Sequence, residues 1–198
     1  MRYFFIFITF FLHNSFAKEY ITQFGFKIDI PNNYIVISED TLDETTDFVR
    51  DQGFNMSAWN NAISNLSSQK TITIYNINDI ENNSEFLHNI NFSSEPIPFE
   101  EIKSSDLDMY CPYYQNMLSD VSNKYVDQLS CNLTREPGLK GNSLYLEHYG
   151  IFPNALSIQY FFWIDNDNFV SSTLTCLKEK CFDDKKTFKK IISSLRRY

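Results

Sequence analysis

Histidine, glycine and proline are scarce in this 198-residue chain, and each shortage excludes a class of protein. With 5 glycines and 6 prolines, the sequence holds neither a flexible linker nor a collagen-like tract. Histidine is the usual proton carrier near neutral pH, and it occurs 3 times. Because His13 lies in an apolar leader, only His88 and His148 remain for acid–base chemistry in the rest of the chain.

The familiar motifs of catalysis are also missing. The sequence contains no Gly-x-Ser-x-Gly elbow, no His-Glu-x-x-His pair and no glycine-rich phosphate loop. Asp165 and Asp167 resemble the start of a calcium loop, but Val170 occupies the position where such a loop needs glycine. Glu100 and Glu101 are adjacent, so they diverge and do not converge on a substrate as glycosidase carboxylates do. We therefore expect no catalytic residue, no metal ligand and no cofactor.

Basic residues are outnumbered by acidic ones. The chain has 25 Asp and Glu against 17 Lys and Arg, which is a net charge of -8. An acidic surface repels phosphate backbones, so the composition argues against nucleic acid as a partner.

The first seventeen residues are typical of a secretory signal peptide. Arg2 precedes an apolar run from Tyr3 to Leu12, and small residues stand at Ser15 and Ala17, the two positions that signal peptidase inspects. The run is about half of the roughly twenty residues that span a bilayer. We therefore expect cleavage between Ala17 and Lys18, no transmembrane anchor after cleavage, and a periplasmic or secreted protein.

Alternating apolar residues predict strands near both ends of the remaining chain, which we expect to form a single domain over residues 18–198. Phe24 to Ile30 alternates strictly, and the turn that follows leads to a second strand at Tyr34 to Ser38, so these two are expected to form a hairpin. Thr71 to Tyr75 is β-branched and predicts a third strand. Three more are expected around 144–148, 156–162 and 170–176, the last two joined by a tight loop at 165–168.

Helical periodicity predicts two helices in the first half of the chain. Thr41 and Glu44 form a capping box that opens the first, and Gly53 ends it. The second presents one apolar face, which consists of Met56, Trp59, Ile63 and Leu66.

Two more helices are expected in the second half. One runs from Pro112 to Cys131, with Tyr125 and Leu129 on its apolar side. The other closes the chain from about 183 to 197 and turns four apolar side chains to the sheet: Phe188, Ile191, Ile192 and Leu195. The stretch 78–103 shows no clear period, so it is expected to be irregular, with a turn of helix around 85–90.

These elements predict an α+β fold, with a mainly antiparallel sheet of about six strands, helices packed on it and a C-terminal amphipathic helix. The opening strands at 24–34, the final strand at Ser172 to Thr175 and the closing helix at 188–195 resemble the PsbP-like superfamily. The resemblance covers both ends of the chain, leaves the middle unmatched and carries no functional residue. It implies helices on both faces of the sheet and an accessory or binding role.

The four cysteines all follow the leader, and an even count in an exported chain favours two disulfides. Of the three possible connectivities, the short spacing favours Cys176 with Cys181, which leaves Cys111 with Cys131. The second bond requires a break in the predicted helix, because a straight helix would hold these cysteines roughly 30 Å apart. We place the break at 119–123, which makes a helical hairpin. A zinc site is the competing explanation.

Two groups of side chains have both a structural and a functional interpretation. The aromatic run from Tyr160 to Trp163 is expected to be core on both faces of its strand, and would line a groove for an apolar ligand if one face were open. The lysines of the closing helix are expected to form a solvent face, with anionic headgroups as the alternative contact.

The function that follows is that of an exported, non-catalytic binding or accessory protein of the cell envelope. Its partner would be an envelope protein or a small apolar ligand, and docking on an envelope complex as an assembly factor is a variant of the same hypothesis. The alternative is a small periplasmic hydrolase with an unrecognised site near His148 or His88. His148 shares a strand face with Leu144 and Leu146 and is expected in the core, whereas His88 is expected to be exposed.

Overall fold

The computed structural model describes residues 17–38, 41–51, 53, 56, 59–60, 71–82, 86–95, 103–165 and 169–198. Several predicted features lie outside these ranges. They are the signal peptide up to residue 16, Ile63 and Leu66 of the second predicted helix, Glu85, and residues 166–168 of the predicted hairpin loop.

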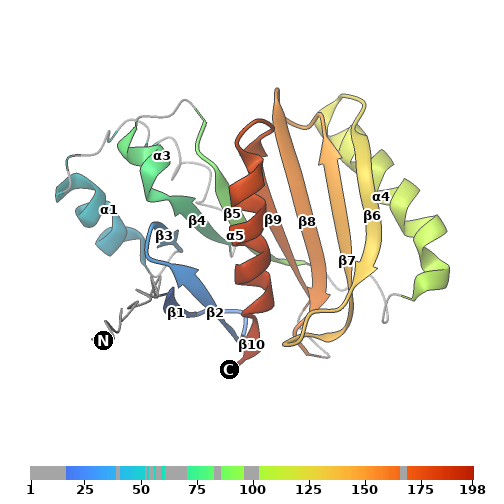
Figure 1. The fold of residues 1–198 in the computed structure, drawn as a ribbon, viewed down its shortest axis with the longest axis horizontal. Coiled ribbons are helices and arrows are strands. Elements are labelled where there is room, and N and C mark those ends of the chain that lie inside the picture. Colours follow the sequence, from blue (N-terminus) through green and yellow to red (C-terminus); the bar gives the residue numbers. More distant parts are fainter. Residues whose placement is uncertain are drawn as a thin grey trace, which may run out of the picture.

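The described strands form two sheets (Figure 1). The larger has seven strands, in the order β3 (Tyr34–Ile37), β4 (Thr71–Asn76), β5 (Asn89–Glu95), β9 (Phe169–Leu177), β8 (Ala155–Trp163), β7 (Lys140–Tyr149) and β6 (Asp127–Thr134). The smaller has three, in the order β1 (Ala17–Ile21), β2 (Phe26–Pro31) and β10 (Arg196–Arg197). Every pairing is antiparallel, so the predicted fold class is confirmed, with more strands than the six expected.

One face of the large sheet is covered by α5 (Cys181–Ser193) together with β2. Figure 1 shows α5 lying across this face, over β5 and β9. The four apolar residues predicted to face the sheet are all buried there: Phe188, Ile191, Ile192 and Leu195. Strand β2 adds Phe26, Ile28 and Ile30, which are buried in the alternating pattern predicted for this strand.

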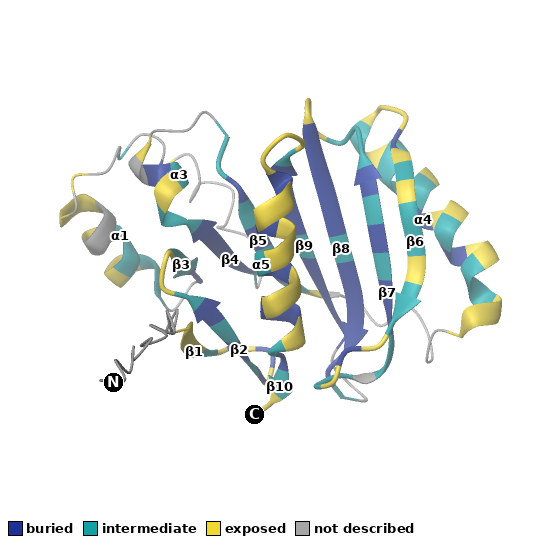
Figure 2. Ribbon diagram, in the orientation of Figure 1, coloured by how far each residue is buried: buried dark blue, intermediate teal, exposed yellow. Residues whose placement is uncertain are grey.

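The opposite face carries α4 (Leu107–Ser122), which packs Tyr110 and Tyr114 against β7 and β8. In β8, Tyr160 and Phe162 belong to the core on the α5 side, while Phe161 and Trp163 belong to the core on the α4 side, and all four are buried. Figure 2 shows β8 as buried along most of its length. The aromatic run is therefore core on both faces, as expected, because each face of this strand has its own helix.

The prediction that the strands at 24–30 and 34–38 form a hairpin is wrong. A tight turn does join β2 to β3, but the two strands enter different sheets. The reason is that β2 already has two neighbours, β1 on one edge and β10 on the other, which leaves no edge for β3. Strand β3 pairs with β4 instead.

The long helix predicted from Pro112 to Cys131 is also wrong in its second half. Helix α4 ends at Ser122, where Asn123 adopts a left-handed conformation, and β6 then returns as a strand. Tyr125 and Leu129 are consequently exposed and belong to no apolar helix face. The break falls where the disulfide geometry required it, but a helix–strand hairpin forms because β6 can pair with β7.

The disulfide partners are those favoured by the sequence. Cys111 of α4 is bonded to Cys131 of β6, and their Cα atoms are 5.9 Å apart. Cys176 at the end of β9 is bonded to Cys181 at the start of α5.

The stretch 78–103 is more regular than expected. It contains β5, a central strand of the large sheet, after the short helix α3 (Ile77–Glu81). Ile90 and Phe92 alternate with Asn and Ser and are fully buried. The predicted turn of helix near residue 90 is wrong, because Asn89 and Ile90 pair with both β4 and β9.

The two ends of the described chain meet in the small sheet. Helix α5 is shorter than predicted, because Arg196 and Arg197 leave it and pair with β2 as β10. The loop at Gly138 packs against the chain where α5 gives way to β10, and only glycine fits there, since a Cβ atom at that position would lie 1.5 Å from the carbonyl oxygen of Leu195. Strand β1 was not predicted, and it begins at the expected cleavage pair, with Lys18 opposite Ile30.

Candidate functional site

A cleft opens where β2 and β3 part after their common turn. Its volume is about 450 Å³, and α1 (Leu42–Asp51) closes the side away from β1. The lining residues are Lys18, Tyr20, Ile30, Pro31, Asn32, Tyr34, Ile35, Val36, Thr41, Glu44, Thr45 and Ile77. The volume lies in the range of roughly 300–1,000 Å³ that is usual for ligand pockets.

The cleft combines apolar walls with a few fixed polar groups. The Tyr20 hydroxyl donates to Ser38 Oγ over 3.2 Å, which holds the Tyr20 ring against β3. The exposed side chains Lys18 and Glu44 lie on the rim and have opposite charges. Burial, together with the nearby Asp184 carboxylate, raises the pKa of Tyr34 above its ordinary value, so this hydroxyl stays protonated and can donate a hydrogen bond.

Strand β3 contributes its outer edge to the cleft. The carbonyl of Asn33 accepts from Ile77 N over 2.9 Å, so the odd-numbered residues of β3 point their backbone groups at β4. The even-numbered ones point outward, and the Val36 carbonyl accepts from the hydroxyls of Thr41 and Thr45. The side chains of Thr41, just before α1, and Thr45, within α1, therefore occupy part of this edge.

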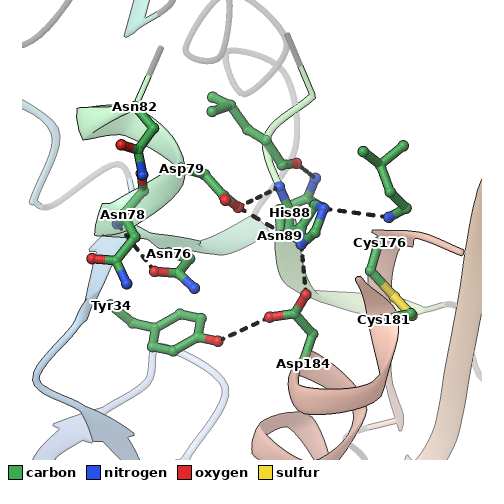
Figure 3. A network of polar contacts seen from close by, with 12 residues as sticks. Tyr34, Asn76, Asn78, Asp79, Asn82, His88, Asn89, Cys176, Cys181 and Asp184 are labelled. Atoms are coloured by element: carbon green, nitrogen blue, oxygen red, sulfur yellow. Dashed lines mark hydrogen bonds and ion pairs between the residues drawn. A yellow bond between two sulfur atoms is a disulfide. The ribbon is translucent and has the colours of Figure 1, made fainter. Parts of the chain in front are cut away.

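Tyr34 connects the cleft to a buried polar network behind it (Figure 3). Its hydroxyl donates to Asp184 Oδ1 over 3.3 Å, and Asp184 Oδ2 lies 2.5 Å from His88 Nδ1. The backbone N–H of His88 donates to Asp79 Oδ2 over 3.1 Å. Burial raises the pKa of Asp79. His88 is 5% exposed, so the expectation that it lies on the surface is wrong.

Both ring nitrogens of His88 are engaged. Nε2 accepts from the backbone N–H of Leu177 over 3.4 Å, so Nδ1 carries the proton and donates it to Asp184. This arrangement ties the end of β9 and the first turn of α5 to the start of β5, beside the Cys176–Cys181 disulfide (Figure 3). A general base needs a nitrogen that can reach a substrate, and His88 presents none to solvent in this arrangement.

We expect the network to contribute to stability. Replacing Asp184 by alanine leaves the buried His88 N–H and the Tyr34 hydroxyl without their acceptor, so the free energy of unfolding should fall by roughly 2 kcal/mol. Urea unfolding measures this change. Asp183→Ala is the matched control, since Asp183 is the neighbouring residue on the same turn and its side chain is 90% exposed. Equal losses in the two variants would contradict the stabilising role.

His148 is in the core, as predicted, on the α4 side of β7. It is 2% exposed, and neither ring nitrogen has a hydrogen-bond partner within the described part of the chain. Burial lowers its pKa to about 4, so the ring is neutral at pH 7. In the register of the sheet its neighbours are Gln128 and Ser157, both uncharged.

A second, smaller cleft of about 210 Å³ lies between α5 and strands β6 to β8. Here Lys185 Nζ lies 2.6 Å from Glu147 Oε2, and the Tyr145 hydroxyl donates to the same carboxylate over 2.6 Å. Burial acts to raise the pKa of Glu147, but these two hydrogen bonds outweigh it and hold the pKa below its ordinary value. The lysines further along α5 are exposed, as expected for a solvent face.

Sequence reasoning missed both the large cleft and the buried network. The network joins Asp184 to Tyr34 and His88, which lie 150 and 96 residues before it along the chain, and no local pattern links them. Among the described residues, no group of three or more His, Cys, Asp and Glu side chains is placed to hold a metal ion. No helix in the described ranges is both long and apolar enough to cross a bilayer.

Comparison with known proteins supports the fold. No family model matches the chain, and no curated protein matches its sequence. Among solved structures, cyanobacterial PsbP (CyanoP) from Synechocystis sp. PCC 6803 is similar, with a TM-score of 0.58 and 12% identity over 94% of this chain and 95% of that one. A crystal structure from Bacteroides thetaiotaomicron VPI-5482 covers 92% of this chain and 49% of its own, with 9% identity and a TM-score of 0.46. The chain therefore has a PsbP-like fold, as its two ends suggested.

Proposed function

We propose that this PsbP-like domain is an exported binding or accessory protein of the cell envelope, and that the cleft between β2 and β3 is its binding site. The observation that carries the proposal is the cleft itself: a hollow of about 450 Å³ with apolar walls, two fixed tyrosines and two opposite rim charges. Pockets that bind small molecules or chain segments have this composition, apolar with a few placed polar groups.

Export is the second part of the proposal. The first seventeen residues have the order of a signal peptide, and the structure pairs all four cysteines into two disulfides. Disulfides persist in oxidising compartments such as the periplasm. Processing after Ala17 would leave Lys18 as the first residue, still paired with Ile30 and on the rim of the cleft.

A hydrolase built on His88 or His148 is the less favoured function. His88 does lie beside Asp184, but its Nε2 is bonded to the backbone of Leu177 and the ring is 5% exposed. His148 is 2% exposed. Neither side chain is among the residues that line the 450 Å³ cleft, which is where a substrate would fit.

The proposal is tested by asking what stays bound when the protein is purified from its native envelope. We expect native mass spectrometry to find a bound molecule on the wild type, on a chain that begins at Lys18. Glu44→Trp places a large side chain on the rim of the cleft and should lower the occupied fraction at least tenfold.

Asp43→Trp is the matched control. Asp43 is the preceding residue, it is exposed on the same first turn of α1, and it does not line the cleft. This variant should carry the molecule as the wild type does. A wild type without any bound molecule, or equal occupancy in the two tryptophan variants, would overturn the assignment of the cleft.

A further inference from the structure

We infer that the cleft takes an extended peptide segment, which adds to the outer edge of β3 as a further strand. The inference rests on the proposed function, because it names the class of ligand for the same cleft. Strand β3 is the terminal strand of the seven-stranded sheet and has a single neighbour, β4. The edge of such a strand is a template for another chain.

The backbone groups that a peptide needs are present on this edge. Because the odd-numbered residues of β3 bond to β4, the carbonyl of Tyr34 and the N–H of Val36 point outward. The N–H of Tyr34 lies at the tight turn of Asn32 and Asn33 and is not counted among the open groups. A peptide lying along the edge would satisfy them in the two-residue period of a β-ladder.

The end of this edge is closed, which limits the length of the peptide. The hydroxyls of Thr41 and Thr45 occupy the Val36 carbonyl, and the backbone N–H of Ser38 donates to Thr41 Oγ1. The open part therefore runs from Tyr34 to Val36. Since a strand rises by about 3.3 Å per residue, this stretch is long enough to pair with three to four peptide residues.

The walls and the charges define the kind of peptide. Alternate side chains of an added strand point to opposite faces, and on one face they would meet Tyr20 and Ile30 of the small sheet. The side chains of Lys18 and Glu44 have opposite charges, and processing after Ala17 adds one positive α-amino group at Lys18. The cleft thus fits an extended segment with alternating apolar residues, and it disfavours a strongly basic chain.

The test uses a defined probe, a pool of fluorescent hexapeptides in which valine, isoleucine or leucine alternates with serine or threonine. We expect fluorescence anisotropy to show binding to the wild type. The same pool with an N-methyl group on every residue should bind at least tenfold more weakly, because neither edge of such a peptide can donate to the ladder. Equal binding of both pools would overturn the inference.

Val36→Pro removes the outward N–H and leaves the hydrogen bonds between β3 and β4 intact. Proline is tolerated on strand edges. The proline variant should bind the peptide pool at least tenfold more weakly than the wild type. Val36→Ile keeps the N–H and should bind the pool as the wild type does. Hydrogen exchange of the Val36 amide needs no variant: in the wild type it should slow at least tenfold when the pool is bound. An unchanged rate would also overturn the inference.

These outcomes separate the inference from the proposed function. One outcome is that the molecule found by mass spectrometry is lost from the Glu44→Trp variant and still binds the Val36→Pro variant as it binds the wild type. In that case the cleft is a binding site, but its ligand does not bind as an added strand. If Glu44→Trp displaces nothing, the proposed function itself fails.

Discussion

The substitution Ile192→Asp is expected to abolish accumulation of the folded protein. Ile192 is fully buried in the core between α5, β2 and the large sheet. Removing a large aliphatic side chain from such a site costs roughly 2–5 kcal/mol, and a buried carboxylate without a partner adds several more. A domain of this size is typically stable by about 5–15 kcal/mol, so the loss is comparable to the total.

Solubility on expression and circular dichroism measure this outcome, and Ile192→Val calibrates it. The valine variant loses one methylene group and should fold, with a free energy of unfolding lower by about 1 kcal/mol. A folded, soluble Ile192→Asp protein would show that α5 is not part of the core.

The exposed face of the same helix provides the matched control. Replacing Lys186 and Lys190 by alanine should change the stability by less than about 0.5 kcal/mol for each residue, because both side chains are in solvent. If this double variant stayed folded and lost function, the basic face of α5 would be a contact surface and not merely a solvent face.

Acidification between about pH 6.5 and pH 4 is expected to destabilise the protein through His148. In the unfolded chain the ring has its ordinary pKa of about 6.5, whereas burial lowers the pKa in the folded protein to about 4. Between these values the unfolded state binds a proton that the folded state does not. The stabilisation is complete above about pH 6.5 and is lost as the pH falls to about 4, by roughly 3 kcal/mol in total.

His148→Leu isolates this effect from the titration of carboxylates. At pH 7.5 the variant should be more stable than the wild type by about 1–3 kcal/mol, because it removes two polar atoms that have no partner among the described residues. Its advantage should then grow as the pH falls from 6.5 to 4. Urea unfolding at pH 7.5, 6.0, 5.0 and 4.5 gives the difference at each pH, and a constant difference would contradict the assignment.

Elements with a complete local period were predictable from the sequence. Strands β8 and β9 and helix α5 bury apolar residues at the spacing of their own secondary structure, and any fold that hides these residues needs the same local conformation. Strand β5 was missed although Ile90 and Phe92 alternate, because the Asn and Ser between them are typical of loops. Here pairing with two neighbouring strands overrides the low strand propensity.

The Cys111–Cys131 disulfide was predicted correctly although the secondary structure predicted around it was partly wrong. The pairing of Cys111 with Cys131 demanded a reversal of the chain near residue 123, and Asn123 provides it. The segment after the reversal was predicted as helix, because Tyr125 and Leu129 continue the helical spacing. The segment forms strand β6 instead, because it pairs with β7, which lies further along the chain.

The sequence by itself determined the α+β class, the closing helix, the favoured cysteine pairs and the likeness to PsbP at the two ends, because each depends on local spacing or on short loops. Only the tertiary structure decided where the cleft lies and what surrounds His88. The cleft exists because β2 has both edges filled by β1 and β10, which sends β3 to the other sheet with an open outer edge. The His88 network joins residues up to 150 positions apart, and such contacts follow from the choice of strand partners, which no local pattern encodes.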